Sequence, residues 1–258
     1  MINASKVFFL PSRAFGGEEK NKIAYKKTSG TKPGFIWCGG LKSDMEGSKA
    51  IALHDWAIKN DHGCVRFDYF GHGQSSGIFS KGTISRWVSD TAQVINELTK
   101  GPQILVGSSM GAWVATLAAL REPKRIKAML FIAPAFDFTE KLMWAGYDET
   151  IRKTIMEKGI YYEPSDYDEP YEISRALILN GRENLLMDVP INFEGPLRIL
   201  QGMQDNSVPW SHAQKLIDIF TSNDIEMSLI KNGGHNLSGE KDIARMLRAA
   251  EEIASRDM

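Results

Sequence analysis

Ser109 stands in a sequence pattern that can turn a serine hydroxyl into a nucleophile. The pattern is G-x-S-x-G, here Gly107-Ser-Ser-Met-Gly111, with a short apolar run before it and a helical pattern after it. This order is typical of a nucleophile elbow, a tight strand-to-helix turn that presents a serine over the end of a sheet. The glycines allow close backbone packing, and the helix N-terminus stabilises developing negative charge. The expected chemistry is attack of the Ser109 oxygen on an acyl carbonyl.

A second G-x-S-x-G match surrounds Ser75, between Gly73 and Gly77. It follows a Gly-His-Gly loop, and no helical pattern comes directly after it. Only Ser109 lies between a buried-strand pattern and a helical one. Ser75 is therefore interpreted as a loop residue.

A nucleophilic serine needs a base, normally a histidine that a carboxylate orients. The candidates are His54, His62, His72, His212 and His235. His54 and His62 lie in a predicted helix and its exit loop, so we expect both at the surface, and we expect His212, at the start of a later helix, to be solvated or near a helix cap. His235 lies in the loop after the last predicted strand and follows the serine in the chain, as the base does in folds with this turn. His235 is therefore the predicted base.

The carboxylate that orients the base should lie between the serine and His235 in the chain. Asp205 meets this condition in the loop after the preceding predicted strand. Its Asp-Asn-Ser sequence could instead form an Asx-type turn. Asp137, at the end of the strand after the elbow, is the rival acid. Chain position favours Asp205 as the third member of a catalytic triad.

Acyl transfer also needs hydrogen-bond donors for the negative oxygen that forms on the carbonyl. The backbone N–H of Met110, directly after the serine, is the first predicted donor. The N–H of Leu41 is the second, because two glycines precede it and let that loop come close. Lys42 either flanks the mouth of the site or is solvated. His72, in the loop after another predicted strand, is a candidate for the wall of the pocket.

Short apolar runs alternate with helical patterns along most of the chain. The predicted strands are residues 6–10, 22–28, 33–38, 64–69, 102–107, 126–133, 196–202 and 225–231, and the predicted helices are 47–59, 83–100, 110–120, 211–220 and a C-terminal segment. This alternation favours an α/β fold with a mostly parallel, eight-stranded sheet and helices on both of its faces. In such sheets ligands bind beyond the carboxyl ends of the strands, which is where the candidate residues fall.

The alternation is interrupted at residues 135–191, where aromatic residues, methionines and acidic turns replace buried strands. We therefore predict a core domain made of residues 1–134 and 192–258, and a cap insertion made of residues 135–191. Apolar side chains of the insertion, Trp144 among them, indicate an acyl-binding pocket. The alternative is that they only pack the insertion against the sheet.

Composition narrows the classes of partner. The chain has 258 residues and a net charge of −1, so no positive field favours nucleic acid. Cys38 and Cys64 make no disulfide framework and are expected to be buried. Metal-ligand spacings such as H-E-x-x-H and C-x-x-C do not occur in the sequence, so neither a metal nor a cofactor is predicted. No apolar run is long enough for a signal peptide or a membrane span, and we expect a cytoplasmic protein, monomeric by default.

These residues resemble those of the α/β-hydrolases over nearly the full length of the chain. The resemblance is carried by Ser109, Asp205, His235 and the segment Phe67-Asp-Tyr-Phe-Gly-His-Gly-Gln-Ser75. Residues 40–50, 66–71 and 101–113 are similar to the family of the mitochondrial palmitoyl-protein thioesterase, which also cleaves acyl glucuronides. Because no mitochondrial transit peptide is evident, the chain resembles the bacterial branch of that family. The resemblance implies serine-dependent hydrolysis of an ester or a thioester.

The sequence thus predicts a serine hydrolase that cleaves esters or thioesters of apolar acyl groups through an acyl-enzyme. The predicted partner is a small molecule or an acylated substrate. Two alternatives stay open. The same triad can hydrolyse carbon–carbon bonds or carry out perhydrolysis, and the same fold can serve a non-enzymatic ligand-binding protein.

Overall fold

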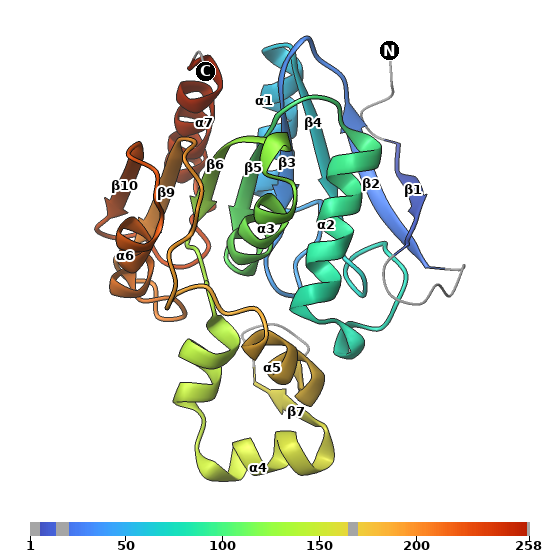
Figure 1. Cartoon of the computed structure of the whole chain (residues 1–258), viewed down its shortest axis with the longest axis vertical. Coiled ribbons are helices and arrows are strands. Elements are labelled where there is room, and N and C mark those ends of the chain that lie inside the picture. The colour runs from blue at the N-terminus through green and yellow to red at the C-terminus, as the bar shows by residue number, and fades with distance from the viewer. Residues whose placement is uncertain (1–5, 14–20, 165–169, 257–258) are drawn as a thin grey trace.

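An eight-stranded sheet runs through the centre of the computed structural model, which describes residues 6–13, 21–164 and 170–256 (Figure 1). Across the sheet the strands are β1 (Phe8–Pro11), β2 (Lys22–Thr28), β4 (His62–Phe67), β3 (Lys32–Cys38), β5 (Gln103–Ser108), β6 (Ile126–Ile132), β9 (Leu197–Gly202) and β10 (Ile225–Ile230). β2 is antiparallel to both of its neighbours, β1 and β4, and the other pairs are parallel. The predicted α/β fold with a mostly parallel eight-stranded sheet is confirmed.

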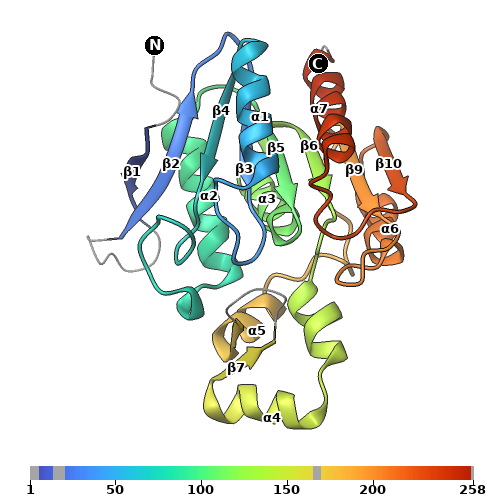
Figure 2. The same ribbon diagram turned by 180° about the vertical axis from the view of Figure 1, so that it is seen from behind.

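Helices cover both faces of this sheet. α1 (Ser48–Lys59) and α7 (Glu240–Ser255) lie on the face turned to the viewer in Figure 2. α2 (Ile84–Leu98), α3 (Met110–Arg121) and α6 (Trp210–Ile219) lie on the face seen in Figure 1. A cluster of buried apolar side chains fills each interface between helices and sheet. Because α3 lies at the centre of its layer, it is apolar and buried on most of its circumference.

Two short 3₁₀ helices lie in the connections between the elements of the large sheet and its covering helices. They are η1 (Phe79–Lys81), before α2, and η2 (Pro123–Arg125), between α3 and β6. Among the described residues, no helix is both long enough and apolar enough to cross a membrane.

Between β6 and β9 the chain leaves the sheet and forms a small lobe beyond the carboxyl ends of the parallel strands (Figure 1). The lobe, residues 139–182, consists of the π-helix η3 (Thr139–Trp144), α4 (Glu149–Lys158), β7 (Ile160–Glu163), β8 (Tyr171–Ser174) and α5 (Arg175–Arg182). β7 and β8 pair as a two-stranded antiparallel sheet. The sequence pattern did not reveal these strands because their only fully buried residues are Ile173 and Ser174.

Asp137 joins the chain that enters the lobe to the chain that leaves it. Its backbone has a φ of 51°, and its side chain is fully buried. The Asp137 carboxylate accepts hydrogen bonds from the N–H groups of Leu186 (2.9 Å) and Met187 (2.8 Å). Burial raises the pKa of Asp137 even though these two donors act in the opposite direction. The structure therefore places this acid at the base of the lobe, where its oxygens are bonded to backbone.

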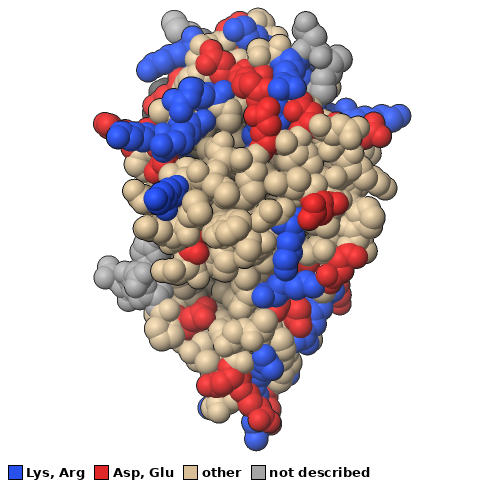
Figure 3. Space-filling view, turned by 90° about the vertical axis from the view of Figure 1, so that its left-hand side faces the viewer, with Lys and Arg blue, Asp and Glu red and all other residues tan. Residues whose placement is uncertain are grey.

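The surface carries both signs of charge on the same side of the molecule. Figure 3 shows the side formed by the β10 edge and α6, where acidic and basic side chains intermingle above and below a band with few charges. Trp210, Ile217 and Leu229 contribute exposed apolar side chains to these two elements. On this face no extended patch of one sign is visible, in keeping with a net charge of −1.

His54 and His62, both expected at the surface, are buried, so those two predictions were wrong. His54 shares the inner stripe of α1 with Ala50 and Leu53, at the spacing of one helix face, and is 1% exposed. His62 stacks on the Trp56 ring, with 5.2 Å between ring centroids, and its Nδ1–H donates to a backbone carbonyl. His212, expected to be solvated or near a helix cap, lies in the first turn of α6, close to the cap residue Pro209. It is buried there, and its Nε2–H donates to a backbone carbonyl at 2.8 Å. The two cysteines are buried and free, as predicted.

We expect His54→Leu to make the stability of the protein less sensitive to acid. Burial, assisted by the positive charge of Arg66, lowers the pKa of His54 to about 4, and both ring nitrogens lack a hydrogen-bond partner. An unfolded histidine has a pKa near ~6.5, so between about pH 6.5 and pH 4 the unfolded state binds a proton that the folded state does not. The free energy of unfolding of the wild-type protein therefore falls through this window as pH falls.

Urea unfolding at several pH values between 7 and 4.5 measures this contribution. The slope of the unfolding free energy should be smaller in the variant by roughly 1 kcal/mol per pH unit. Equal slopes in the two proteins would contradict the assignment. The conservative exchange Ile58→Leu, at an exposed position of the same helix, is the matched control.

Candidate active site

The turn between β5 and α3 holds Ser109 in a backbone conformation that most residues avoid. Its φ is 54° and its ψ is −122°. A Cβ added to Gly111 would lie 2.1 Å from the Cys38 carbonyl oxygen, and one added to Gly107 would lie 2.5 Å from the Ala112 Cα. These contacts require glycine on both sides of the serine. They also explain why the N-terminus of α3 lies directly against the end of β3.

The structure brings Ser109, His235 and Asp205 into one line of hydrogen bonds. The Ser109 hydroxyl oxygen lies 3.0 Å from His235 Nε2, and His235 Nδ1 lies 2.8 Å from Asp205 Oδ2. The serine comes from the β5–α3 turn, the aspartate from the β9–α6 loop and the histidine from the β10–α7 loop. All three loops meet at the carboxyl edge of the parallel strands, which is why residues distant in sequence lie side by side.

Asp205 is held as a charged acceptor. Burial by itself would raise its pKa, but the hydrogen bond and charge of His235, with the N–H of Val208 and the amide of Gln201, hold the pKa below its ordinary value. The ionised Asp205 therefore keeps the proton of His235 on Nδ1. The Nε2 lone pair is then free to accept the Ser109 proton.

The Asx-type turn considered for Asp205 is also present. Asp205 Oδ1 accepts hydrogen bonds from the N–H groups of Ser207 (2.9 Å) and Val208 (2.8 Å), while Oδ2 faces His235. The two interpretations of this residue are thus compatible. The turn uses one oxygen to fix the carboxylate, and the other oxygen remains directed at the imidazole.

The loop after β3 lies against the serine. A Cβ added to Gly40 would be 3.4 Å from the Ser109 Cβ, and the next residue, Leu41, lines the same cavity as Met110. Both residues predicted to donate a backbone N–H are therefore beside the serine. The Lys42 side chain reaches the lobe, where its ammonium group donates to the Pro170 carbonyl at 2.9 Å.

A cavity of about 1000 Å³ opens over the Ser109 hydroxyl. The chain that leads into and through the lobe contributes mostly apolar residues, among them Phe138, Leu142, Met143 and Tyr147, together with the carboxylate of Glu163. A polar wall comes from the loop between β3 and α1, the N-terminal end of α1 and the loop after His235. This polar wall, which the sequence did not reveal, contains Ser43, Asp44, Ser48, Lys49, Asn236 and Ser238. These two walls suit two chemically different parts of one ligand.

Two residues predicted as possible pocket residues do not line this cavity. His72 lies behind the loop after β3 and is 4% exposed. Trp144 packs within the lobe against the guanidinium groups of Arg152 and Arg182, which lie 5.5 and 4.6 Å from its ring centroid. Ser75 is a loop residue, as interpreted, and its hydroxyl donates to the Asp68 carbonyl at 2.6 Å.

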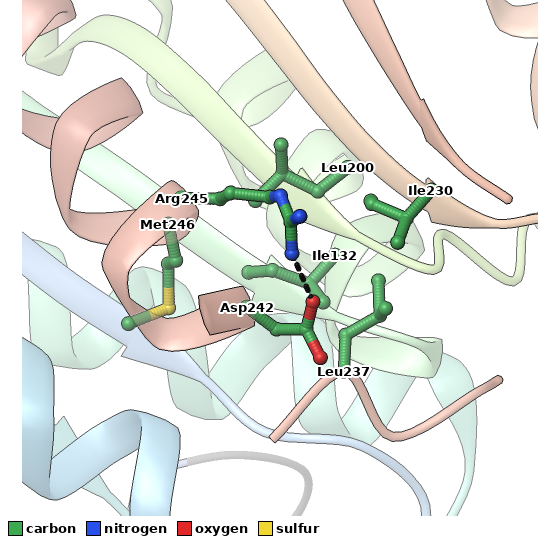
Figure 4. Close-up of a pocket in the computed structure, with 7 residues that line it drawn as sticks. All are labelled: Ile132, Leu200, Ile230, Leu237, Asp242, Arg245 and Met246. Carbon is green, nitrogen blue, oxygen red and sulfur yellow. Dashed lines mark hydrogen bonds and ion pairs between the residues drawn. The ribbon is translucent and has the colours of Figure 1, made fainter. Parts of the chain in front are cut away.

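A second depression lies between the sheet and α7, away from the serine (Figure 4). Its walls are Ile132, Leu200, Ile230, Leu237, Asp242, Arg245 and Met246. Asp242 and Arg245 form an ion pair at 2.6 Å, and the remaining space is too small for a water molecule. This depression is a packing defect of the core. In the described part of the chain, no group of three or more His, Cys, Asp or Glu side chains could hold a metal ion.

This sheet, elbow and three-residue line define the class of α/β-hydrolases. The family model described as Serine aminopeptidase, S33, matches residues 46–162. The human protein named palmitoyl-protein thioesterase ABHD10, mitochondrial, is 34% identical over 233 residues, which cover 90% of this chain and 76% of that protein.

Two solved structures extend the similarity to the fold. A crystal structure of an Agrobacterium vitis S4 protein has a TM-score of 0.92 and 36% identity, and covers 97% of this chain and 99% of its own. The mouse alpha/beta hydrolase domain-containing protein 10 has a TM-score of 0.87 and 31% identity, with 96% and 98% covered. The chain belongs to the family of α/β-hydrolases that contains these thioesterases, and it is a hydrolase. The resemblance stated from the sequence is confirmed.

We expect Gly111→Ala to destabilise the fold, because the added methyl group would overlap the carbonyl oxygens of Cys38 and Gly39. Overpacking of this kind costs about 1–3 kcal/mol. Urea unfolding measures the loss. Gly146→Ala is the matched control, since a Cβ at that position would meet no atom within 4 Å. If both variants unfold at the same urea concentration, the close approach of α3 to β3 is not required.

Proposed function

We propose that this protein is a serine hydrolase that cleaves carboxylic esters or thioesters of apolar acyl groups through an acyl-enzyme intermediate. One observation carries the proposal. Ser109, His235 and Asp205 form a continuous line of hydrogen bonds, at 3.0 and 2.8 Å, whose serine end faces a cavity large enough for a substrate.

The proposed reaction has two halves. His235 Nε2 takes the Ser109 proton while the Ser109 oxygen bonds to the acyl carbon, and the N–H groups of Met110 and Leu41 stabilise the negative oxygen. His235 then returns the proton to the departing alcohol or thiol as its bond to the acyl carbon breaks. In the second half, a water molecule loses a proton to His235 and attacks the acyl carbon. The carboxylic acid leaves and the Ser109 hydroxyl is restored.

The walls of the cavity support an apolar acyl group. Phe138, Leu142 and Met143 offer the acyl chain an apolar surface on the lobe side, and burying each methylene group there gains about 0.8 kcal/mol. The polar wall suits the leaving group. The names of the relatives, palmitoyl-protein thioesterases, agree with a long acyl chain. In this proposal, residues 135–191 are the cap that shapes acyl specificity over the core domain.

Other reactions of the same triad remain the second candidates. Carbon–carbon bond hydrolysis and perhydrolysis need the same proton transfers, and only product analysis separates them from ester hydrolysis. A purely ligand-binding protein would have no need for a histidine positioned between the serine and a charged carboxylate. The cytoplasmic location and the monomeric state remain predictions, and the relatives are named as mitochondrial.

We expect Asp205→Asn to reduce the hydrolysis of a p-nitrophenyl ester by roughly 10⁴-fold while the fold is retained, because an amide can no longer hold the histidine proton on Nδ1. The measurement is kcat with circular dichroism as the check on folding. Ser109→Ala should lose both turnover and labelling by a fluorophosphonate probe. Asp137→Asn is the matched control, since that carboxylate binds backbone at the base of the lobe. If the Asp137 variant loses turnover through a lowered kcat at unchanged stability, and Asp205→Asn does not, the acid is wrongly assigned.

We expect Leu142→Trp to shift preference towards short acyl chains, because a larger side chain would fill the apolar side of the cavity. With p-nitrophenyl esters from two to sixteen carbons, kcat/KM should fall at least tenfold for the longest chains and change less than about threefold for acetate, given roughly fourfold per methylene group. Leu179→Trp, an exposed position in the same lobe, should leave the chain-length profile unchanged. Identical profiles in both variants would show that these apolar residues only pack the lobe.

A further inference from the structure

The loop that carries Leu41 is a tight turn with an unfavourable backbone. Its residue Lys42 has a φ of 56°, in the left-handed region that costs a non-glycine residue about 1–2 kcal/mol. The Gly40 carbonyl oxygen accepts hydrogen bonds from both the N–H (3.2 Å) and the hydroxyl (2.9 Å) of Ser43. The C=O and N–H of a trans peptide unit point in opposite directions. These two bonds therefore turn the Leu41 N–H away from the turn.

The next peptide unit of this loop is held by a histidine distant in sequence. The Lys42 N–H donates to His72 Nε2 at 3.0 Å. An imidazole nitrogen that accepts a hydrogen bond carries no proton, so the His72 proton must be on Nδ1. His72 Nδ1 lies 3.2 Å from the Phe70 carbonyl oxygen, which also accepts from the Trp87 indole N–H at 3.1 Å. The imidazole thus connects the loop after β3 to the loop after β4 and to α2.

The surroundings of His72 fix the orientation of its ring. Tyr69, Phe79 and Trp87 contact it edge to face, with ring centroids 5.6, 5.2 and 5.2 Å away. The residue is 4% exposed, and burial lowers its pKa to about 4. The ring is therefore neutral at physiological pH, which is the only state in which Nε2 can accept the Lys42 N–H.

We propose that His72 is a positioning residue for the oxyanion hole: its Nε2 fixes the Leu41–Lys42 peptide unit and so holds the Leu41 N–H in the direction of the reacting carbonyl. The proposal rests on the proposed function of Ser109. His72 touches neither substrate nor serine, and acts through the backbone of the loop. Ser43 fixes one peptide unit of the turn and His72 fixes the next, so both units flanking Leu41 are held. Loss of the His72 bond leaves the strained backbone of Lys42 free to relax.

The test compares His72→Phe with His72→Gln. Phenylalanine keeps the aromatic contacts but has no acceptor, whereas glutamine keeps an oxygen that can reach the Lys42 N–H. Complete loss of an oxyanion donor costs on the order of 10²–10³ in rate, so a misdirected donor should lower kcat of the phenylalanine variant by roughly 10–100-fold. KM for a p-nitrophenyl ester should stay within about twofold, and His72→Gln should recover kcat to within roughly fivefold of wild type.

Inhibition by an alkyl boronic acid gives a second measurement, and a general loss of stability would not change its inhibition constant. Boron adds to the serine oxygen and forms a tetrahedral anion that uses the same donors, so its inhibition constant should rise in proportion to the fall in kcat. His62→Phe is the matched control. It also removes a buried imidazole that is bonded to a backbone carbonyl, that of Pro33, but His62 lies at the start of β4, the end of that strand away from His72. This control should leave kcat unchanged.

The outcomes separate this proposal from the proposed function. Full kcat in a folded His72→Phe variant, or a lowered kcat with an unchanged boronic-acid constant, would overturn the role of His72. If His72→Phe does not fold, His72→Gln is the deciding variant. A fall of tenfold or more in its kcat, with a boronic-acid inhibition constant equal to that of the wild-type protein, would also overturn the role of His72. Turnover that survives Ser109→Ala would instead remove the proposed function itself.

Discussion

The backbone of Ser109 is the constraint on which the rest of the site depends. A non-glycine residue at φ 54° and ψ −122° costs about 1–3 kcal/mol, and the surrounding structure must compensate. Hydrogen bonds from the Ser109 N–H to the Ile132 carbonyl and from the Ala135 N–H to the Ser109 carbonyl tie this turn to the end of β6 and the chain that follows it. Because the serine is fixed in this way, the loops carrying the acid, the base and the oxyanion donor can all be placed relative to it.

Strained backbone is concentrated around this centre. In the described residues, the non-glycine positions with positive φ are Lys42, Asp61, Ser109, Ala133, Asp137 and Leu237. All but Asp61 follow the carboxyl end of a strand of the parallel part of the sheet. Strain of this kind is typical of functional sites, where geometry is retained at the expense of local stability. Here the positive φ values lie in the loops between elements, and not in the helices that cover the sheet.

Chain order and position after strands were enough to predict which serine, acid and histidine would lie together. The loops that follow parallel strands all lie at the carboxyl edge of the sheet. The environment of single side chains was harder to predict. His54 was expected at the surface of its predicted helix, although its spacing from Ala50 and Leu53 marks the inner face of that helix. The role inferred for His72 was out of reach, since its partner Lys42 is 30 residues away and the bond depends on how two loops fold together.

The two buried aspartates considered as catalytic acids show how environment divides similar residues. Burial acts on both, but Asp205 faces an imidazole that holds its pKa low, whereas the Asp137 carboxylate is hydrogen-bonded by backbone N–H groups and burial raises its pKa. The bond that Asp137 makes has another effect, because it closes the lobe into a loop whose ends meet. The entropy of closing a loop grows slowly with its length. A longer or shorter segment can therefore replace this one during evolution while the strands stay in place, so specificity can diversify independently of the catalytic scaffold.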